Sequence, residues 1–305
     1  MKEKTVYVLT GPTASGKSNA ALRLAEKTRG EILCMDSMQV YRGMDVGTAK
    51  PTKEERRRVP HHLLDLCDPA ESFSVSDWAE HCRPLLSSVP VPILTGGTGL
   101  YLDAVSYDRD FGAVGADEAI RAKYHAVADS EGCARLHAIL AARDSAAAAK
   151  LHPNDVRRVV RALEVLDLTG RSITSFTLRR SPPGLRFRIF AIDRPREELY
   201  RRIDRRADAM MASGLLEEVR ALWEAGIPRT ATAIQGIGYK ELYQYFASET
   251  SLEEAVRTIR LRTRHYAKRQ LTWFRHDPRV TWIPHGMQDA ADFILNAAEE
   301  DSPAG

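Results

Sequence analysis

The stretch VYVLTGPTASGKSNAALRLA, Val6–Ala25, decides the fold of this chain. It begins with a short apolar run, continues through glycines, a lysine and a serine, and ends in a pattern of helical length. Within it, GPTASGKS, Gly11–Ser18, matches the phosphate-binding loop G-x-x-x-x-G-K-[ST] at each fixed position. A strand before such a loop and a helix after it are the expected context, so the stretch predicts a phosphate-binding α/β protein.

The residues of this P-loop have separate expected roles. The glycines let the backbone bend so that its amides face phosphate oxygens, and the following helix adds a favourable dipole. Lys17 supplies a mobile cation, and the hydroxyl of Ser18 is a candidate ligand for Mg²⁺. The loop leaves the reaction open, because Asp36 and Asp193 each end an apolar run and either fits the acidic residue of a nucleotide hydrolase or kinase.

Further apolar runs extend the α/β pattern along the chain. They alternate with amphipathic segments of helical length, such as Asn19–Lys27 and Glu197–Met211, as in a parallel sheet covered by helices. The fold class predicted is therefore α/β, a P-loop NTPase-like core with a parallel sheet. The expected strands are Val6–Leu9, Ile32–Met35, Val91–Leu94, Arg188–Ile192 and Val280–Ile283.

Residues 112–183 differ from the rest in composition. They are alanine-rich, poor in strand signals and helix-periodic, and the loop-like stretches DFGAVGAD and SPPG bound them. We interpret them as a small helical domain inserted into a core made of residues 1–111 and 184–305. A helical layer packed on the sheet remains the alternative.

Composition narrows the class of protein. The chain has 305 residues, enough for a sizeable core, and a net charge of only +3, so any polyanion-binding surface must be local. The four cysteines, Cys34, Cys67, Cys82 and Cys133, have no close pair, which suits neither a zinc site nor a disulfide framework. No signal peptide or membrane span is apparent, and we expect a cytoplasmic protein without a membrane partner.

Two further segments are predicted to meet the P-loop, because ligands of open α/β sheets bind at the carboxyl ends of the strands. Asp36 follows one expected strand and could ligate magnesium, cap the next turn or act as a general base. The loop Thr95–Tyr101, TGGTGLY, follows another and carries Thr98. Its glycines alone indicate only a tight turn. The hydroxyl of Thr98 is a candidate contact for a phosphate or bridging oxygen.

Local basic segments indicate a phosphate-rich partner. Residues 257–275 contain seven Lys or Arg and no Asp or Glu, and on a helix five of them share one face: Arg257, Arg260, Arg264, Lys268 and Arg275. An unbroken cationic face of this length fits a polynucleotide backbone better than a solvated surface. Residues 150–180 carry a net +4 and include Arg157, Arg158 and Arg161. Arg202 and Arg206 lie one helical turn apart and suit pyrophosphate, although Asp204 and Asp208 could pair with them instead.

With these residues assembled, the chain closely resembles the bacterial tRNA dimethylallyltransferases, also called tRNA isopentenyltransferases. The resemblance covers nearly the whole chain and rests on several motifs in order. They are GPTASGKS, DSMQVYRGMDVGTAKP, HHLLDL, GGTGLY, HPNDVRRVVRALEV, IQGIGYKEL and AKRQLTWFR. The second and the last two are the most specific. Thr95 stands where the family usually has an apolar residue.

The resemblance implies an activity and a site. Dimethylallyl diphosphate would donate its prenyl group to the exocyclic amine of the adenosine immediately 3′ of the tRNA anticodon, and residues 112–183 would clamp the tRNA. Asp36 would be the base, and Thr98 and Arg206 would stabilise the diphosphate in a P-loop that also holds Mg²⁺. The P-loop set is Gly11, Pro12, Thr13, Ala14, Ser15, Gly16, Lys17 and Ser18.

The same resemblance supplies the expected tRNA contacts. Ser37, Met38 and Gln39 would line the adenine pocket beside Asp36 and Thr98. The remaining contacts would be Arg121, Arg157, Arg158, Val159, Val160, Arg161, Gln235, Gly236, Ile237, Gly238, Tyr239 and Lys240, with Arg264 and Lys268 from the basic segment. A single chain is expected to be active as a monomer. The rival hypotheses are an ATP-dependent small-molecule kinase and a non-catalytic RNA-binding ATPase module.

Overall fold

The structure, a computed structural model, describes residues 3–109, 115–176, 178–179, 182–287 and 289–300. Contacts between Cα atoms divide the chain into two compact units, Met1–Ser106 with Ser181–Gly305, and Tyr107–Arg180. We call them the core unit and the helical unit and describe each by itself.

The core unit contains a six-stranded parallel sheet in the order β3-β2-β4-β1-β7-β8. The strands are β1 Lys4–Thr10, β2 Glu31–Cys34, β3 His61–His62, β4 Pro92–Thr95, β7 Leu185–Ile192 and β8 Val280–Ile283. The helices are α1 Lys17–Thr28, α2 Lys53–Arg58, α3 Val75–Ser88, α4 Gly99–Ser106, α9 Arg196–Ala212, α10 Leu215–Glu224, α11 Tyr239–Phe246, α12 Leu252–Arg275 and α13 Ala290–Glu300, with a 3₁₀ turn η3 at Ala233–Gln235.

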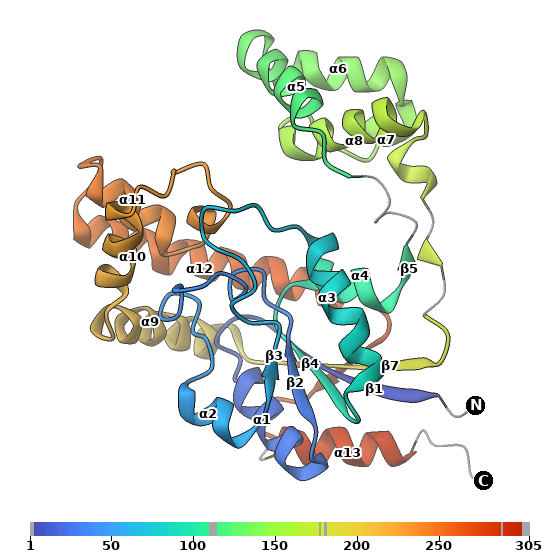
Figure 1. Ribbon diagram of the computed structural model, residues 1–305, viewed down its shortest axis with the longest axis vertical. Helices are drawn as coiled ribbons and strands as arrows, with labels where there is room; N and C mark the ends of the chain where they lie inside the picture. The colour runs from blue at the N-terminus through green and yellow to red at the C-terminus, as the bar shows by residue number, and fades with distance from the viewer. Residues whose placement is uncertain (1–2, 110–114, 177, 180–181, 288, 301–305) are drawn as a thin grey trace. The chain divides into compact units, whose positions relative to one another are not determined.

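Successive side chains of each strand face opposite sides of the sheet, which explains the continuous apolar runs. Leu33 and Leu94 join a cluster with α3, α4 and α9–α12 on one side. Ile32 and Ile93 join a second cluster with α1 and α13 on the other side. Figure 1 shows α1 and α13 together below the strands. Both faces are therefore buried.

The helical unit has its own apolar core. The helical unit comprises α5 Glu118–Glu131, α6 Cys133–Arg143, α7 Ser145–Ala148, α8 Val156–Thr169, the 3₁₀ turn η2 Ile173–Ser175, and a short antiparallel pair, β5 Asp108–Arg109 with β6 Leu178–Arg179. Leu136, Leu140, Val159 and Leu163 are fully buried within this unit. Their spacing of three or four residues places each pair on one helix face.

The predicted fold class is confirmed, and all five expected strands are present within three residues of their expected bounds. The sixth strand, β3, was not predicted because its two residues, His61 and His62, give no apolar run. The expected boundary between residues 111 and 112 lies outside the described residues. By contacts, the helical unit begins at Tyr107 and ends at Arg180.

Candidate active site

The P-loop connects β1 to α1, as its sequence predicted. Gly11 has φ 135° and Gly16 has φ 97°, conformations that residues with a β-carbon rarely adopt. A β-carbon on Gly11 would lie 3.2 Å from the carbonyl oxygen of Ile192 in the neighbouring strand. Lys17 begins the helix, and the Ser18 side chain is exposed. The hydroxyl of Ser15 is buried without a hydrogen-bond partner in the described part of the chain, which leaves a polar atom for a ligand.

Arg202 and Arg194 bind backbone carbonyls of the P-loop. Neither residue was assigned to this loop from the sequence. Arg202 Nε donates to the carbonyl of Ala14 at 2.7 Å, and Arg194 Nε donates to the carbonyl of Ser15. Glu198 pairs with Arg194 at 2.8 Å. Because these two carbonyls are fixed by the arginines, the bent conformation of the adjoining backbone is held in place.

Lys17, Arg206 and Asp36 lie within electrostatic reach of one another. Burial, with a further contribution from Arg206, lowers the pKa of Lys17 to about 8, while Asp36 acts to raise it. Burial also lowers the pKa of the Arg206 guanidinium, and again Asp36 opposes the shift. Two cations are thus held partly desolvated beside one carboxylate, which leaves an excess positive charge suited to a polyanion.

Thr98 lies between Asp36 and helix α12. Its hydroxyl oxygen accepts the amide of Ser37 at 3.3 Å, and Tyr266 of α12 lies near it. Burial raises the pKa of Tyr266, and the Asp36 charge adds to the rise, so the phenol is neutral at physiological pH. The loops after β2 and β4 therefore meet, as expected from their place at the same edge of the sheet.

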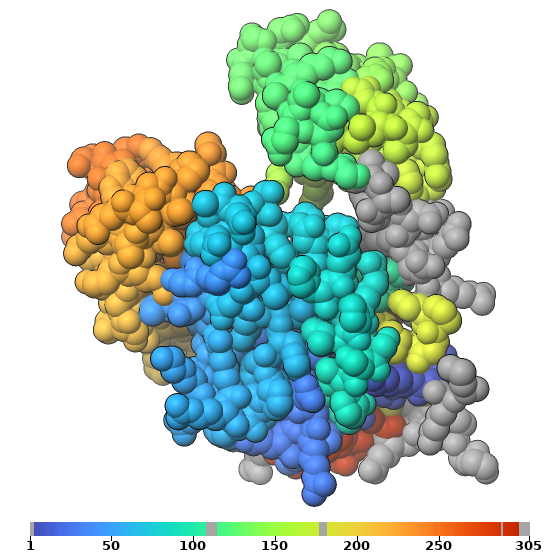
Figure 2. All heavy atoms as spheres, in the orientation of Figure 1, coloured from blue at the N-terminus to red at the C-terminus, as the bar shows by residue number. Residues whose placement is uncertain are grey.

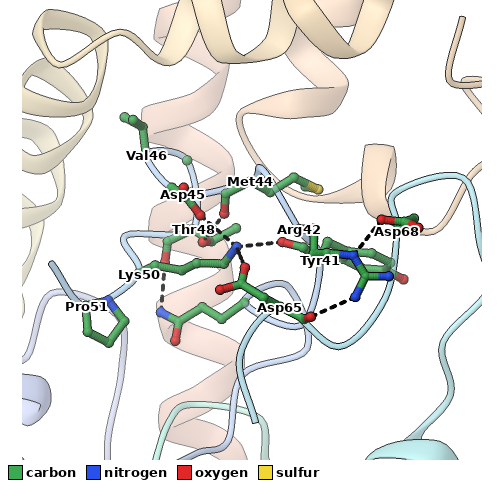
Figure 3. A network of polar contacts seen from close by, with 12 residues as sticks. Tyr41, Arg42, Met44, Asp45, Val46, Thr48, Lys50, Pro51, Asp65 and Asp68 are labelled. Atoms are coloured by element: carbon green, nitrogen blue, oxygen red, sulfur yellow. Dashed lines mark hydrogen bonds and ion pairs between the residues drawn. The ribbon is translucent and has the colours of Figure 1, made fainter. Parts of the chain in front are cut away.

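The loop after β2 is held by the buried ammonium group of Lys50. Lys50 Nζ donates to the carbonyl of Tyr41 at 2.6 Å and to carboxylates of Asp45 at 2.8 Å and Asp65 at 2.6 Å (Figure 3). Gln39 Nε2 donates to the carbonyls of Thr48 and Ala49, so its amide group stabilises this loop. Asp36 Oδ1 accepts the amide of Met38 at 2.9 Å, which leaves Oδ2 for another partner.

The segment Gln235–Lys240 connects η3 to α11 and lies beside the loop after β2. In Figure 2 residues 36–73 and residues 215–250 form adjoining surfaces of the core unit. A β-carbon on Gly236 would lie 2.5 Å from Cε of Met38, so a larger residue would displace the end of the Met38 side chain. Lys240 Nζ donates a hydrogen bond to Gln235 Oε1 at 3.2 Å. The Tyr239 side chain is fully buried. Met38 and Gly236, both expected to contact tRNA, are thus neighbours.

The cationic face of α12 is not unbroken, contrary to expectation. Four of its arginines bind carboxylates: Arg257 pairs with Glu254, Arg260 with Asp208, Arg262 with Glu241, and Arg264 with Asp204. Asp204 and Asp208 belong to α9, which the sequence could not place opposite α12. Lys268, Arg269 and Arg275 are exposed and have no carboxylate partner among the residues described. The unpaired positive charge therefore lies at the carboxyl-terminal end of α12.

In the helical unit, the expected tRNA contacts divide into buried and exposed residues. The side chains of Val159 and Val160 are in the apolar core, which corrects the expectation that the whole run 157–161 faces RNA. Arg121 Nε and Arg161 Nη1 donate to the buried carboxylate of Glu164 at 2.8 and 2.6 Å. Arg157 and Arg158 are exposed. A run of five residues in a helix covers more than one turn, so its side chains cannot all lie on one face.

The described ranges contain no group of three or more His, Cys, Asp or Glu side chains that could hold a metal ion. A magnesium ion bound through Ser18 and substrate oxygens needs no such group. None of the helices in the described ranges is long and apolar enough to cross a membrane.

Fold and site together define a P-loop protein in which a carboxylate, two cations and a hydroxyl lie at one edge of the sheet. Its relatives agree with that class. A family model described as IPP transferase matches residues 39–277, and one described as isopentenyl transferase matches residues 4–65. The chain belongs to the IPP transferase family.

Individual relatives match nearly end to end. A tRNA dimethylallyltransferase from Geobacter metallireducens is 49% identical over 93% of this chain and 94% of its own. One from Bacillus subtilis is 44% identical over 92% and 91%. The crystal structure of the tRNA isopentenylpyrophosphate transferase from Bacillus halodurans superposes with a TM-score of 0.72 at 43% identity, covering 98% of both chains. A eukaryotic dimethylallyltransferase acting on tRNA gives 0.78 at 27% identity, covering 97% of this chain and 79% of its own.

Proposed function

We propose that this protein transfers the dimethylallyl group of dimethylallyl diphosphate to the exocyclic amine of the adenosine 3′-adjacent to the tRNA anticodon. Membership of the IPP transferase family supports prenyl transfer as the class of activity. The observation that supports the assignment of residues is the grouping of Asp36, Lys17 and Arg206. A small-molecule kinase is not favoured, since the relatives are named as prenyl transferases.

Asp36 is proposed as the general base. The exocyclic amine of adenine is a weak nucleophile because its lone pair is delocalised into the ring. A carboxylate that accepts one of its protons as the new bond forms removes the charge that would otherwise develop on nitrogen. The amide of Met38 fixes one oxygen of Asp36, so the other oxygen has a defined direction.

The P-loop and two cations are proposed to hold the leaving group. As the nitrogen–carbon bond forms, the bond between the allylic carbon and the diphosphate oxygen breaks, and the diphosphate leaves with both electrons. Lys17 and Arg206 face that developing charge in a partly desolvated position, where an ionic interaction is stronger than in water. The hydroxyl of Thr98 is placed to donate to the same group.

Magnesium fits the donor set of this site. The exposed hydroxyl of Ser18, at the first turn of α1, would hold the ion together with diphosphate oxygens. Bound there, it would neutralise part of the diphosphate charge.

The tRNA is proposed to bind through exposed cations of both units. Lys268, Arg269 and Arg275 of α12 and Arg157 and Arg158 of α8 have the charge that an RNA backbone requires. The target adenine must leave its stack to reach Asp36, as in other enzymes that act on a base. A single chain is proposed to be active as a monomer.

The deciding experiment uses unmodified tRNA, labelled dimethylallyl diphosphate and Mg²⁺, followed by nucleoside analysis. We expect label on the adenosine next to the anticodon and release of diphosphate. Hydrolysis of ATP without any transfer of label to RNA would reject the proposed function.

A further inference from the structure

We propose that Gln270 is a positioning residue that fixes Thr98 relative to the P-loop. The proposal rests on the function proposed above. Gln270 lies in the basic segment of α12 but is itself buried, with 5% of its surface exposed. Neither the charge pattern nor the motifs of the sequence predicted a role for Gln270.

Both ends of the Gln270 amide bind a loop of the active site. Its Oε1 accepts the backbone amide of Thr13 in the P-loop at 2.8 Å, and its Nε2 donates to the carbonyl of Gly97 at 2.9 Å. Thr13 and Gly97 follow neighbouring strands, β1 and β4, whose pairing ends at Leu9 and Thr95, and Thr10 Oγ1 adds a hydrogen bond to the carbonyl of Gly96 at 2.8 Å. Gln270 therefore links the loop tips directly.

The residues next to Gln270 leave room for its amide to make these two hydrogen bonds. A β-carbon on Gly97 would lie 1.9 Å from Gln270 Nε2, so any larger residue would displace the amide. Tyr266, one helical turn earlier, lies close to both Thr98 and Gln270. Gln270 thus holds the residue next to Thr98 in the chain, and Tyr266 lies near Thr98 itself.

This arrangement bears on the chemistry. The P-loop holds the diphosphate and Thr98 addresses its oxygen atoms, so the distance between the two loops sets whether both contacts form at once. A displacement of about 1 Å in a positioned group can lower a rate by about 100-fold. Gln270 acts by fixing the position of Thr98 relative to the P-loop and does not itself touch the reacting atoms.

The test is a double-mutant cycle with Gln270→Leu and Thr98→Val, measured as single-turnover prenyl transfer. We expect Gln270→Leu to lower the rate about 100-fold, in keeping with a misplaced contact. The double variant should then lose little more than Thr98→Val alone, because Gln270 acts through Thr98. Affinity for tRNA should stay within about twofold of wild type, as expected for a buried side chain. Gln244→Leu on α11 is the control and should leave the rate unchanged.

Two outcomes would overturn the proposal: a Gln270→Leu rate close to wild type, or losses that multiply in the double variant. Should Gln270→Leu fail to fold, Gln270→Glu replaces it in the double-mutant cycle. The glutamate keeps the acceptor for the Thr13 amide and loses the donor to the Gly97 carbonyl. Failure of the proposed function is distinct, since wild type would then transfer no prenyl group.

Discussion

Tyr239 donates its hydroxyl to Oε1 of Glu218 at 2.6 Å, and this carboxylate also binds a loop of the active site. It accepts three consecutive backbone amides, those of Asp45, Val46 and Gly47, at 2.7, 2.7 and 3.0 Å. Consecutive amides that converge in this way form an anion-binding concavity, here filled by the protein's own carboxylate. Glu218 therefore fastens the loop after β2, including the carbonyls that hold Gln39, to α10 and α11.

Tyr239→Phe should destabilise the core unit by about 1–3 kcal/mol, the usual effect of removing a hydrogen bond to a charged group. Glu218→Ala should cost more, because three amides lose their acceptor. Urea unfolding measures both changes. The control is Glu217→Ala, an exposed neighbour on the same helix, which should leave the midpoint nearly unchanged. Equal midpoints for Glu218→Ala and Glu217→Ala would contradict the fastening role.

The affinity of the free enzyme for pyrophosphate should fall as pH rises through about 8. Burial and Arg206 lower the pKa of Lys17 to that value, so the neutral amine predominates above it, and binding then requires uptake of a proton. Titration calorimetry between pH 7 and 9.5 measures the effect. Lys17→Arg is the comparison, because the guanidinium stays charged while the ligand titrates as before. Parallel pH profiles for the two proteins would show that Lys17 does not titrate in this range.

Asp36→Asn should lower the single-turnover rate of transfer by about 10²–10⁴-fold, the contribution typical of a positioned general base. The amide oxygen of asparagine can still accept the Met38 amide, so the loop should keep its shape. Filter binding should therefore give a tRNA affinity within a few-fold of wild type. A rate equal to that of wild type would remove the base assignment.

The backbone of the fold could be predicted because its signals are local. The strand–P-loop–helix pattern, the alternation of apolar runs with amphipathic segments and the change of composition at residues 112–183 all lie within short windows of sequence. His61–His62 escaped prediction because sheet pairing beside β2 makes it a strand and hydrophobicity does not. Local propensity predicts an element poorly when tertiary pairing determines it.

Side-chain partners were the part that sequence could not supply. Arg260 and Arg264 were expected on an unbroken cationic face that binds RNA, yet α9 lies against α12 and its Asp208 and Asp204 pair with them. Gln270 was missed for the same reason, because its two partners are more than 170 residues away in sequence. The signal that existed was positional: a polar residue on the buried face of an amphipathic helix requires a hydrogen-bond partner.

The ion pairs of α12 predict which cations control the salt dependence of tRNA binding. Lys268→Ala should reduce the slope of log affinity against log salt by about 0.7–0.9, the release of roughly one counterion. Arg264→Ala should reduce it less, because Asp204 at 2.5 Å already neutralises that guanidinium. Arg257→Ala, paired with Glu254, is the matched control. A larger change for Arg264→Ala than for Lys268→Ala would mean that RNA displaces Asp204.

The helical unit should lose stability on acidification through the ordinary pKa range of a glutamate. Burial alone would raise the pKa of Glu164, but hydrogen bonds from Arg161, the Asp117 amide and Arg121 bring it below the ordinary value. The stabilisation is present above the unfolded pKa, about 4.3, and is lost as pH falls through the lower folded value. Glu164→Gln should remove this acid dependence and lower stability at pH 7. Unfolding of the full chain, followed by hydrogen exchange in α5 and α8, separates this effect from the core unit. Identical exchange of wild type and Glu164→Gln at pH 7 would contradict it.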